Sequence, residues 1–460
     1  MYEFVLKETA AIHLPPSAQH PVISEIIRGY TAGIKWEILF DSAENTIIIG
    51  SASIPEISDE DFVLNIDEKG MAISGKDYAS TLRGLFDFLE RLQATDPKEY
   101  SCNKDLYKEK AKIAFRSVHL CFFPETSFAF MRKAIRAIAV SKYTHILLEF
   151  WGTLKYDCFK YLCWNKGLTK EEVRELVLEA KALGLEVVPF FNHLGHAALS
   201  RGMSGKHVVL DQAPEYGYLF FPDSHGWVWN FLRKDVRQLL REVRRELCEL
   251  CGEGSYFHIG CDEAFILGYG QNYAKEIAEY INEIEEDLRA EGRRPMIWGD
   301  MLLSKAFLPE GTRGYMCNSS EEIANILLNN INKNVIIADW QYFVKTDRIW
   351  KTSVLFKERG FEVICCPWSD RETLKAPIDT VVEQKLLGIM KTTWNTLQKE
   401  ELGPLVQLGL SAVKGEHDDS WHALYYGADN AAGMLRGVSP SGGDYLKSGW
   451  RKDQLELTDY

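Results

Sequence analysis

Short apolar runs recur at eight places between residues 111 and 400, and helical patterns fall between them. The runs are Ile113–Phe122, His145–Phe150, Glu186–Phe191, Tyr256–Gly260, Met296–Trp298, Val335–Ala338, Val363–Pro367 and Leu386–Met390. Several are apolar at successive positions, as expected of strands that are covered on both faces. A parallel sheet closes on itself at eight strand–helix repeats, so the pattern predicts a (β/α)8 TIM barrel over residues 111–400.

The helical patterns carry their own start and stop signals. Thr169 and Glu172 have the spacing of a capping box, an apolar stripe follows them, and Gly184 ends the stripe. A doubly wound open sheet is the main competing architecture. It would need a glycine-rich phosphate loop after its first strand, and the segment Arg116–Cys121 contains no glycine.

Both flanks of the predicted barrel have distinct patterns. Strand-like runs and two helical stretches, one of them Tyr78–Leu92, predict a small α/β domain over residues 1–105. The lysine-rich segment Thr95–Lys112 is typical of a linker, and residues 401–460 predict a helical extension. The predicted fold class is therefore α/β, a TIM barrel preceded by a small α/β domain and followed by a helical C-terminal segment.

Charge and composition exclude several classes of partner. The net charge of −13 argues against nucleic acid or an anionic membrane surface, because both attract basic patches. No apolar run approaches the roughly 20 residues needed to span a bilayer, and the N-terminus shows no signal-peptide pattern. Ten cysteines are scattered without a regular framework, and the pair Cys248 and Cys251 falls on a helical face. These features predict a cytoplasmic protein.

Catalytic groups of such barrels lie at the carboxyl ends of the strands. Five of the twelve tryptophans fall at predicted strand ends, namely Trp151, Trp298, Trp340, Trp368 and Trp394. Any one of them alone is explained as a cap on the barrel core, but five at one rim favour a shared aromatic box. Because aromatic walls bind the apolar C–H faces of sugar rings, the box indicates a carbohydrate substrate.

The dipeptide Asp262-Glu263 follows the fourth predicted strand. Inside a strand the two side chains would point to opposite faces, but at a strand end the backbone leaves the sheet and both can turn toward one site. Two close carboxylates do not both ionise cheaply, and the proton that one of them then keeps is what a general acid needs. This setting favours a catalytic pair over a solvated helix N-terminus.

Three histidines also lie near predicted strand ends, namely His193, His196 and His258. A barrel metallohydrolase would use such side chains as ligands, so this alternative stays open. It would place an H-x-H pair at the end of the first strand, where the sequence has Arg116-Ser-Val-His119. We therefore expect no metal ion and no other cofactor.

The strand-end segments resemble motifs of a known family. His258–Glu263 resembles the H-x-G-G-D-E motif of glycoside hydrolase family 20, the β-N-acetylhexosaminidases, with Cys261 in place of the second glycine. Leu194-Gly195-His196 resembles the P-G-H element of that family, and Phe115-Arg116-Ser resembles the segment whose arginine holds sugar hydroxyls. Residues 61–92 are similar to the family's small N-terminal α/β domain.

The resemblance implies an exo-acting, retaining enzyme that releases terminal GlcNAc or GalNAc from an oligosaccharide substrate. In that mechanism the substrate's own acetamido oxygen attacks the anomeric carbon and forms an oxazolinium intermediate. By the same resemblance, Glu263 protonates the leaving oxygen and later activates water, while Asp262 orients the acetamido N–H.

The resemblance also implies which residues bind the sugar. Tyr342 is the candidate hydrogen-bond partner of the acetamido oxygen. The remaining candidates are Arg116, His196, Trp298, Trp340, Trp368 and Trp394. The family often places an acidic residue near its last strand, where this chain has Trp394-Asn395, so Asp370 is the candidate substitute. The preference between the gluco and galacto epimers stays open.

Two other functions remain compatible with the residues themselves. A two-carboxylate retaining glycosidase would pair Glu263 with Glu149 or Asp300 and would not need the acetamido group. A catalytically silent sugar-binding barrel would keep the aromatic box, but it has no need for two adjacent carboxylates. For the assembly state, the sequence leaves a homodimer open.

Overall fold

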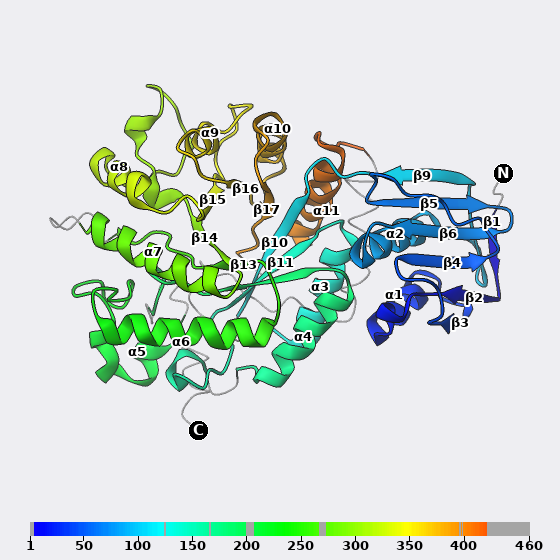
Figure 1. The fold of residues 1–460 in the computed structure, drawn as a ribbon, viewed down its shortest axis with the longest axis horizontal. Coiled ribbons are helices and arrows are strands. Elements are labelled where there is room, and N and C mark those ends of the chain that lie inside the picture. The colour runs from blue at the N-terminus through cyan, green and yellow to red at the C-terminus, as the bar shows by residue number, and fades with distance from the viewer. Residues whose placement is uncertain are drawn as a thin grey trace.

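Eight parallel strands close into a barrel at the centre of the larger domain (Figure 1). The structure is a computed structural model, and it describes residues 4–123, 126–164, 167–198, 207–265, 273–394, 397 and 399–420. The barrel strands are β10 (Phe115–Phe122), β11 (His145–Phe150), β12 (Glu186–Phe190), β13 (Tyr256–His258), β14 (Arg294–Trp298), β15 (Ile336–Trp340), β16 (Val363–Cys366) and β17 (Gly388–Lys391). Each strand pairs with its neighbours in the sequence, and β17 pairs with β10. The predicted TIM barrel is confirmed, and each predicted run overlaps one strand.

Helices surround the barrel on its outer face (Figure 1). They are α3 (Phe128–Val140), α4 (Lys170–Ala182), α6 (Lys234–Cys251), α7 (Ala274–Ala290), α8 (Glu321–Asn330), α9 (Lys351–Glu358), α10 (Lys375–Gln384) and α11 (Lys399–Lys414). The predicted capping box at the start of α4 is confirmed, because Thr169 and Glu172 each accept a hydrogen bond from the other's backbone. The helix ends as predicted, with Gly184 in the left-handed region at φ 77°.

The barrel interior is filled by side chains that alternate along the strands. A buried cluster of such residues includes Leu147, Val188, Phe190, Met296, Ile336, Ile364 and Met390. Residues of the opposite parity pack outward against the helices. Because all eight strands run in the same direction, their carboxyl ends meet at one rim, and every strand-end side chain is delivered to that rim.

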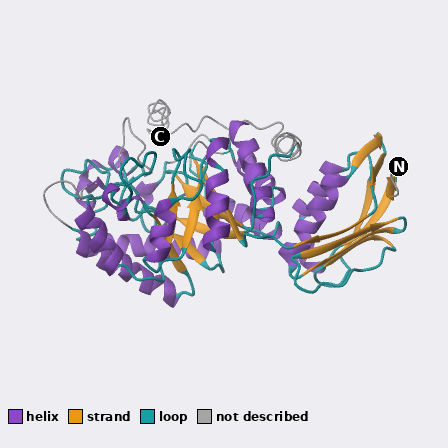
Figure 2. Ribbon diagram, turned by 90° about the horizontal axis from the view of Figure 1, so that it is seen from above, coloured by secondary structure: helices purple, strands orange, loops and turns teal. Residues whose placement is uncertain are grey.

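The N-terminal domain is a curved sheet with helices on the side that faces the barrel (Figure 2). The six-stranded sheet has the order β3 (Lys35–Leu39), β2 (Thr9–His13), β4 (Thr46–Gly50), β6 (Gly70–Gly75), β5 (Phe62–Asp67) and β9 (Asp105–Glu109). The helices are α1 (Pro21–Tyr30) and α2 (Tyr78–Arg91), and they contact α4 and α3 of the barrel, respectively. The predicted α/β domain is therefore joined to the barrel by helix packing.

The segment Thr95–Lys112 is not a linker, so this prediction is wrong. It contributes β9 to the six-stranded sheet, and β7 (Gln93–Asp96) and β8 (Glu99–Cys102) form a three-stranded sheet with β1 (Phe4–Lys7). All four residues of β7 are exposed, so this strand lacks the alternation of apolar and polar residues that marks a half-buried strand. Linkers and exposed strands are both rich in polar residues, so the composition of this segment did not distinguish between them.

The predicted C-terminal extension is described only at its start. Helix α11 spans Lys399–Lys414, and residues 421–460 lie outside the described residues. The hydroxyl of Tyr143 donates to the Leu405 carbonyl at 2.7 Å, which attaches α11 to the segment that precedes β11. None of the helices in the described ranges combines the length and the apolar character needed to cross a bilayer.

Candidate active site

The carboxylate pair leaves the barrel directly after β13. This strand ends at His258, and the backbone then passes through the left-handed region at Gly260 (φ 68°), Cys261 (φ 73°) and Glu263 (φ 46°). These turns break the alternation of the strand, so Asp262 and Glu263 no longer have to point to opposite faces. A left-handed backbone costs a residue with a Cβ roughly 1–2 kcal/mol. Contacts around the pair must therefore hold the turn in place.

His196 joins the two carboxylates. Its Nε2 lies 3.3 Å from Asp262 Oδ2 and 3.1 Å from Glu263 Oε2. The side-chain amide of Asn192 donates to the other oxygen of Asp262 at 2.9 Å. Asp262 is thus held at both oxygens and is buried, whereas the Glu263 side chain keeps 29% of its surface exposed. Partial exposure suits a group that exchanges a proton with a substrate and with water.

The segment after β12 supplies these partners because it packs directly on the segment after β13. A Cβ at Gly195 would lie 2.0 Å from the Asp262 carbonyl oxygen, so only glycine permits this approach. The backbone N–H of His193 donates to the Ile259 carbonyl at 2.9 Å. His193 itself is fully buried, and burial holds the pKa of its imidazole well below the usual value. We therefore assign His193 to the barrel wall.

A third carboxylate, Asp300, supports the pair from the end of β14. Its Oδ2 accepts the backbone N–H of Glu263 at 3.0 Å and the amide of Asn318 at 2.8 Å. Its Oδ1 accepts the indole N–H of Trp340 at 3.1 Å. Burial, together with the negative charge of Asp262, raises the pKa of Asp300 to about 7, although the donors act in the opposite direction. Asp300 therefore positions both the backbone of Glu263 and the ring of Trp340.

The described part of the long connection between β12 and β13 covers one side of the pair. It contains α5 (Val209–Gln212) and α6, and it places Trp227 against His196 with 4.3 Å between ring centroids. The indole N–H of Trp227 donates to the Glu263 carbonyl at 2.7 Å. Sequence reasoning missed Trp227, because no periodic pattern places a loop residue beside a distant strand end.

Five predicted aromatic residues gather at the carboxyl ends of β14 to β17. Ring centroids are 5.0 Å apart for Trp340 and Tyr342, 5.4 Å for Tyr342 and Trp368, and 5.7 Å for Trp298 and Trp394. The indole N–H of Trp394 donates to the Tyr342 hydroxyl oxygen at 2.7 Å, which connects the two halves of the group. Four of the five tryptophans proposed for the aromatic box therefore lie together with Tyr342, next to the Asp300 carboxylate that supports Glu263.

Other strand-end residues are held by partners of their own. Trp151 is buried in a separate cluster with Cys121 and Phe123, and among the five grouped rings Trp394 packs against that cluster. The indole N–H of Trp368 donates to Glu401 at 3.0 Å, and Glu401 forms a buried ion pair with Lys391. Lys391 and Glu401 carry no pattern that would have placed them beside an aromatic side chain.

Asp370 lies at the same end of the barrel, after β16. Lys345 Nζ contacts its carboxylate at 2.7 Å, and the side chain also caps a short 3-10 helix by accepting the backbone N–H of Glu372. The hydrogen bond from Lys345 lowers the pKa of Asp370. A sugar hydroxyl would have to share this carboxylate with the lysine, so the role of Asp370 stays a prediction.

Arg116 lies at the opposite end of the barrel, and the prediction that it holds sugar hydroxyls is wrong. Strand β10 begins at Phe115, so Arg116 is at its amino end. The guanidinium donates to the carbonyls of Lys142 at 2.7 Å and Ile113 at 2.6 Å. It is buried beside a cleft of about 880 Å³ that the barrel shares with the N-terminal domain. The error arose from the register, because the carboxyl end of this strand is reached only at Phe122.

In the described part of the chain, the side chains able to bind a metal do not include the carboxylate pair. Among the described residues, one group of three brings its donor atoms within 4.8 Å of one another, and it consists of His119, Cys121 and Glu149. His196, by contrast, contacts the two carboxylates of the pair and the ring of Trp227. The arrangement around His196 is therefore that of an acid–base site.

Comparisons with known proteins agree with this geometry. Residues 163–402 match the profile of the glycosyl hydrolase family 20 catalytic domain. The chain is 25% identical over 289 residues to lacto-N-biosidase of Bifidobacterium bifidum, which covers 56% of this chain and 24% of that protein. It is 25% identical over 171 residues to hexosaminidase D of Bos taurus, which covers 34% of this chain and 46% of that protein. The chain thus matches about a quarter and about half of the lengths of these relatives.

A solved structure shows the same fold over nearly the whole chain. The GH20 β-N-acetylhexosaminidase of Streptomyces coelicolor superposes with a TM-score of 0.63 and 14% identity, covering 94% of each chain. At this identity the likeness concerns the fold. The profile match, in contrast, spans the segments that carry His196, Asp262, Glu263 and Trp394.

Proposed function

The chain belongs to glycosyl hydrolase family 20, and from this premise we propose that it is an exo-acting, retaining β-N-acetylhexosaminidase. It releases terminal GlcNAc or GalNAc through an oxazolinium ion formed by the substrate's own acetamido group. The observation that carries the proposal is the Asp262–Glu263 pair, joined by His196 at the carboxyl end of the barrel. The hexosaminidase and lacto-N-biosidase named above support the same class of substrate.

Glu263 is the proposed general acid and base. It gives its proton to the leaving glycosidic oxygen, and as a carboxylate it then takes a proton from the water that opens the oxazolinium ring. His196 Nε2, 3.1 Å from Glu263 Oε2, steadies the carboxyl group in both states. The backbone of Glu263 is fixed by Asp300 and Trp227, which hold its N–H and its carbonyl, respectively.

Asp262 is the proposed partner of the acetamido group. As a carboxylate it accepts the acetamido N–H and stabilises the positive charge that spreads over the forming ring. Asn192 and His196 already fix its two oxygens, so little reorganisation is required when the charge develops. Tyr342 is the proposed donor to the acetamido oxygen, because an oxygen that accepts the Trp394 indole N–H retains its own hydrogen as a donor.

The experiment that tests the proposal compares chromogenic β-glycosides of GlcNAc, GalNAc, glucose and galactose. We expect cleavage of the two acetamido sugars only, and a fall in kcat of about 10²- to 10⁴-fold in Glu263→Gln. Glu358→Gln, on the outer helix α9, is the matched control and should keep full activity. Equal cleavage of glucose and galactose would favour the two-carboxylate mechanism, and cleavage of none would favour a sugar-binding barrel.

A second measurement isolates the role of the acetamido group. Fluorine atoms on the acetyl methyl withdraw electrons from the carbonyl oxygen, so a trifluoroacetamido substrate should react far more slowly if that oxygen is the nucleophile. In a mechanism that uses Asp300 or Glu149 as nucleophile, the substitution should change kcat little. The ratio of the two rates therefore separates the mechanisms without any mutation.

A cytoplasmic location is part of the proposal. It is supported by ten free cysteines, most of them buried, which suit a reducing compartment. Fractionation of the producing cells with an activity assay tests the location, and activity found only outside the cells would contradict it. A homodimer is the candidate assembly, and light scattering of the purified protein tests it by measuring the molar mass in solution.

A further inference from the structure

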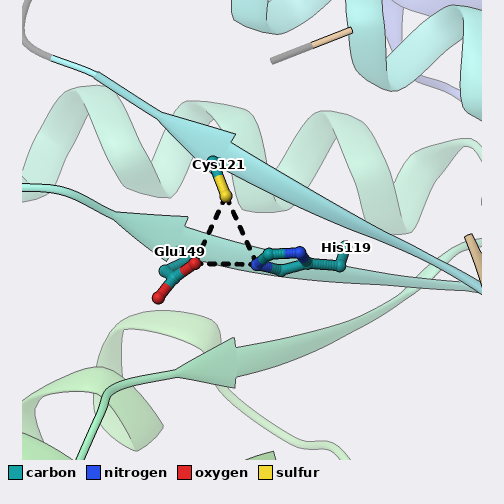
Figure 3. A group of neighbouring side chains, drawn as sticks. All are labelled: His119, Cys121 and Glu149. Atoms are coloured by element: carbon teal, nitrogen blue, oxygen red, sulfur yellow. Dashed lines mark hydrogen bonds and ion pairs between the residues drawn. The ribbon is translucent and has the colours of Figure 1, made fainter. Parts of the chain in front are cut away.

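Three side chains with different metal-binding atoms meet inside the barrel near the carboxyl ends of β10 and β11 (Figure 3). His119 and Cys121 lie two residues apart on β10, so both project from the same face of the strand. Cys121 is in register with Glu149 of β11, which brings the carboxylate to the same level. We expected no metal because Arg116–His119 was predicted to lie at the end of this strand. The strand instead continues to Phe122, so its end carries a His-x-Cys pair.

The distances among the donor atoms are close to those of a first coordination shell. His119 Nε2 is 2.8 Å from Glu149 Oε2, and Cys121 Sγ is 3.4 Å from His119 Nε2 and 3.3 Å from Glu149 Oε2. A tetrahedral zinc ion with bonds of about 2.0 Å to nitrogen and oxygen and about 2.3 Å to sulfur holds such atoms roughly 3.3–3.6 Å apart. The two sulfur distances fit already, and the histidine and glutamate need to separate by only about half an ångström.

Charge and burial favour a dication at this position. His119 and Cys121 are fully buried and Glu149 is 2% exposed. A buried carboxylate costs free energy unless its charge is compensated. A divalent ion bound by one thiolate, one carboxylate and a neutral imidazole leaves no net charge at the site. Nitrogen and sulfur donors select zinc and related transition metals over magnesium and calcium, which prefer oxygen.

We propose that His119, Cys121 and Glu149 form a binding site for one zinc-class divalent ion. Three protein ligands leave one coordination position for water or another small ligand. The ring of His119 contacts Trp394 and Trp298, with centroids 4.6 Å and 5.8 Å apart. The bound ion therefore stiffens the barrel behind two rings of the grouped aromatic residues. None of the three proposed ligands is assigned a role in the acid–base step, and occupancy of the site does not depend on the proposed hydrolysis.

Cobalt(II) tests the proposal, because it replaces zinc and is coloured. The full chain is stripped with a chelator and titrated with cobalt(II), and absorption is recorded in the visible range and in the near-ultraviolet. We expect one equivalent to bind with visible bands of tetrahedral cobalt and a thiolate-to-cobalt charge-transfer band. Absence of an equimolar charge-transfer band in the wild-type protein overturns the proposal and leaves a hydrogen-bonded cluster without metal.

Variants assign the ligands. Cys121→Ser should remove the charge-transfer band, and Glu149→Gln should weaken cobalt binding at least tenfold. Cys158→Ser is the matched control, because this cysteine lies beside Glu246 and away from the site, and it should keep the band. A band that persists in Cys121→Ser overturns the assignment. Far-ultraviolet circular dichroism of each variant shows whether it is folded, and the wild-type titration decides the case if Cys121→Ser is not.

Discussion

Asp300 should make the free energy of unfolding of this protein fall as the pH rises from 5 to 8. Its pKa rises from the ordinary 3.8 to about 7 because the carboxyl is buried beside Asp262. A carboxyl whose folded pKa lies above its unfolded pKa favours the folded state while it is protonated. That contribution is complete below about pH 4 and is lost as the pH rises through about 7. The shift corresponds to about 4 kcal/mol in total, of which about 2–3 kcal/mol is lost between pH 5 and pH 8.

Asp300→Asn removes this titration while keeping the size of the side chain. In the asparagine, an NH2 group replaces one of the two oxygens that accept the N–H of Glu263 and the indole N–H of Trp340. Two donors then face each other, and the lost hydrogen bond lowers the free energy of unfolding by about 1–3 kcal/mol at every pH. The informative quantity is therefore the change with pH. We expect the free energy of unfolding of the wild type, relative to the variant, to fall by about 2–3 kcal/mol between pH 5 and pH 8.

Denaturant titrations followed by tryptophan fluorescence at the two pH values measure this difference. Asp370→Asn is the control, because Lys345 lowers the pKa of Asp370 below its ordinary value of 3.8. This carboxyl is therefore ionised in both the folded and the unfolded state at pH 5 and at pH 8, and its removal should leave the pH dependence between these values unchanged. If the curves of wild type and Asp300→Asn stay parallel within about 1 kcal/mol, burial next to Asp262 does not perturb Asp300 as argued.

Three further substitutions test the contacts that hold the site. Asn192→Ala removes the donor to a buried oxygen of Asp262 and should lower the free energy of unfolding by about 1–3 kcal/mol in a denaturant titration, and no loss would show that water replaces the amide. Gly195→Ala places a Cβ 2.0 Å from the Asp262 carbonyl oxygen and should lower the melting temperature strongly, whereas Gly217→Ala, with nothing within 4 Å, should not. Tyr342→Phe should reduce kcat on a GlcNAc glycoside about 10²-fold without unfolding the protein. An unchanged kcat would remove Tyr342 from the mechanism.

The barrel and the carboxylate pair could be predicted because their signals are local. Eight apolar runs alternate with helical patterns, and a strand's carboxyl end is defined by the same run that predicts the strand. Asp262 and Glu263 were placed correctly at the barrel rim because they directly follow such a run. Trp298 and Trp340 were placed by the same reasoning, and both lie at the last position of their strands.

The misassigned Arg116 and the missed Asn192 and Trp227 depend on strand ends and loop packing, which a local run of residues does not encode. Arg116 was assigned to the sugar although it lies one residue inside the amino end of β10, where its guanidinium caps backbone carbonyls. Asn192 and Trp227 contact the carboxylate pair through folding of distant segments, with separations of 70 residues from Asp262 and 36 residues from Glu263. Pairing over such distances depends on the packing of two loops, and neither loop has a periodic pattern.

The left-handed backbone at three residues around the pair affects how this protein can be altered. His196, Cys261 and Glu263 adopt φ values of 56°, 73° and 46°, each at a cost on the order of 1–3 kcal/mol. Selection for heat resistance alone would favour glycine or asparagine at all three positions, and at two of them it would remove the imidazole or the acid. Thermostability and turnover are therefore opposed at His196 and Glu263. Cys261 carries no proposed reacting group, so a substitution to glycine or asparagine at this position can lower the backbone strain without removing a group needed for turnover.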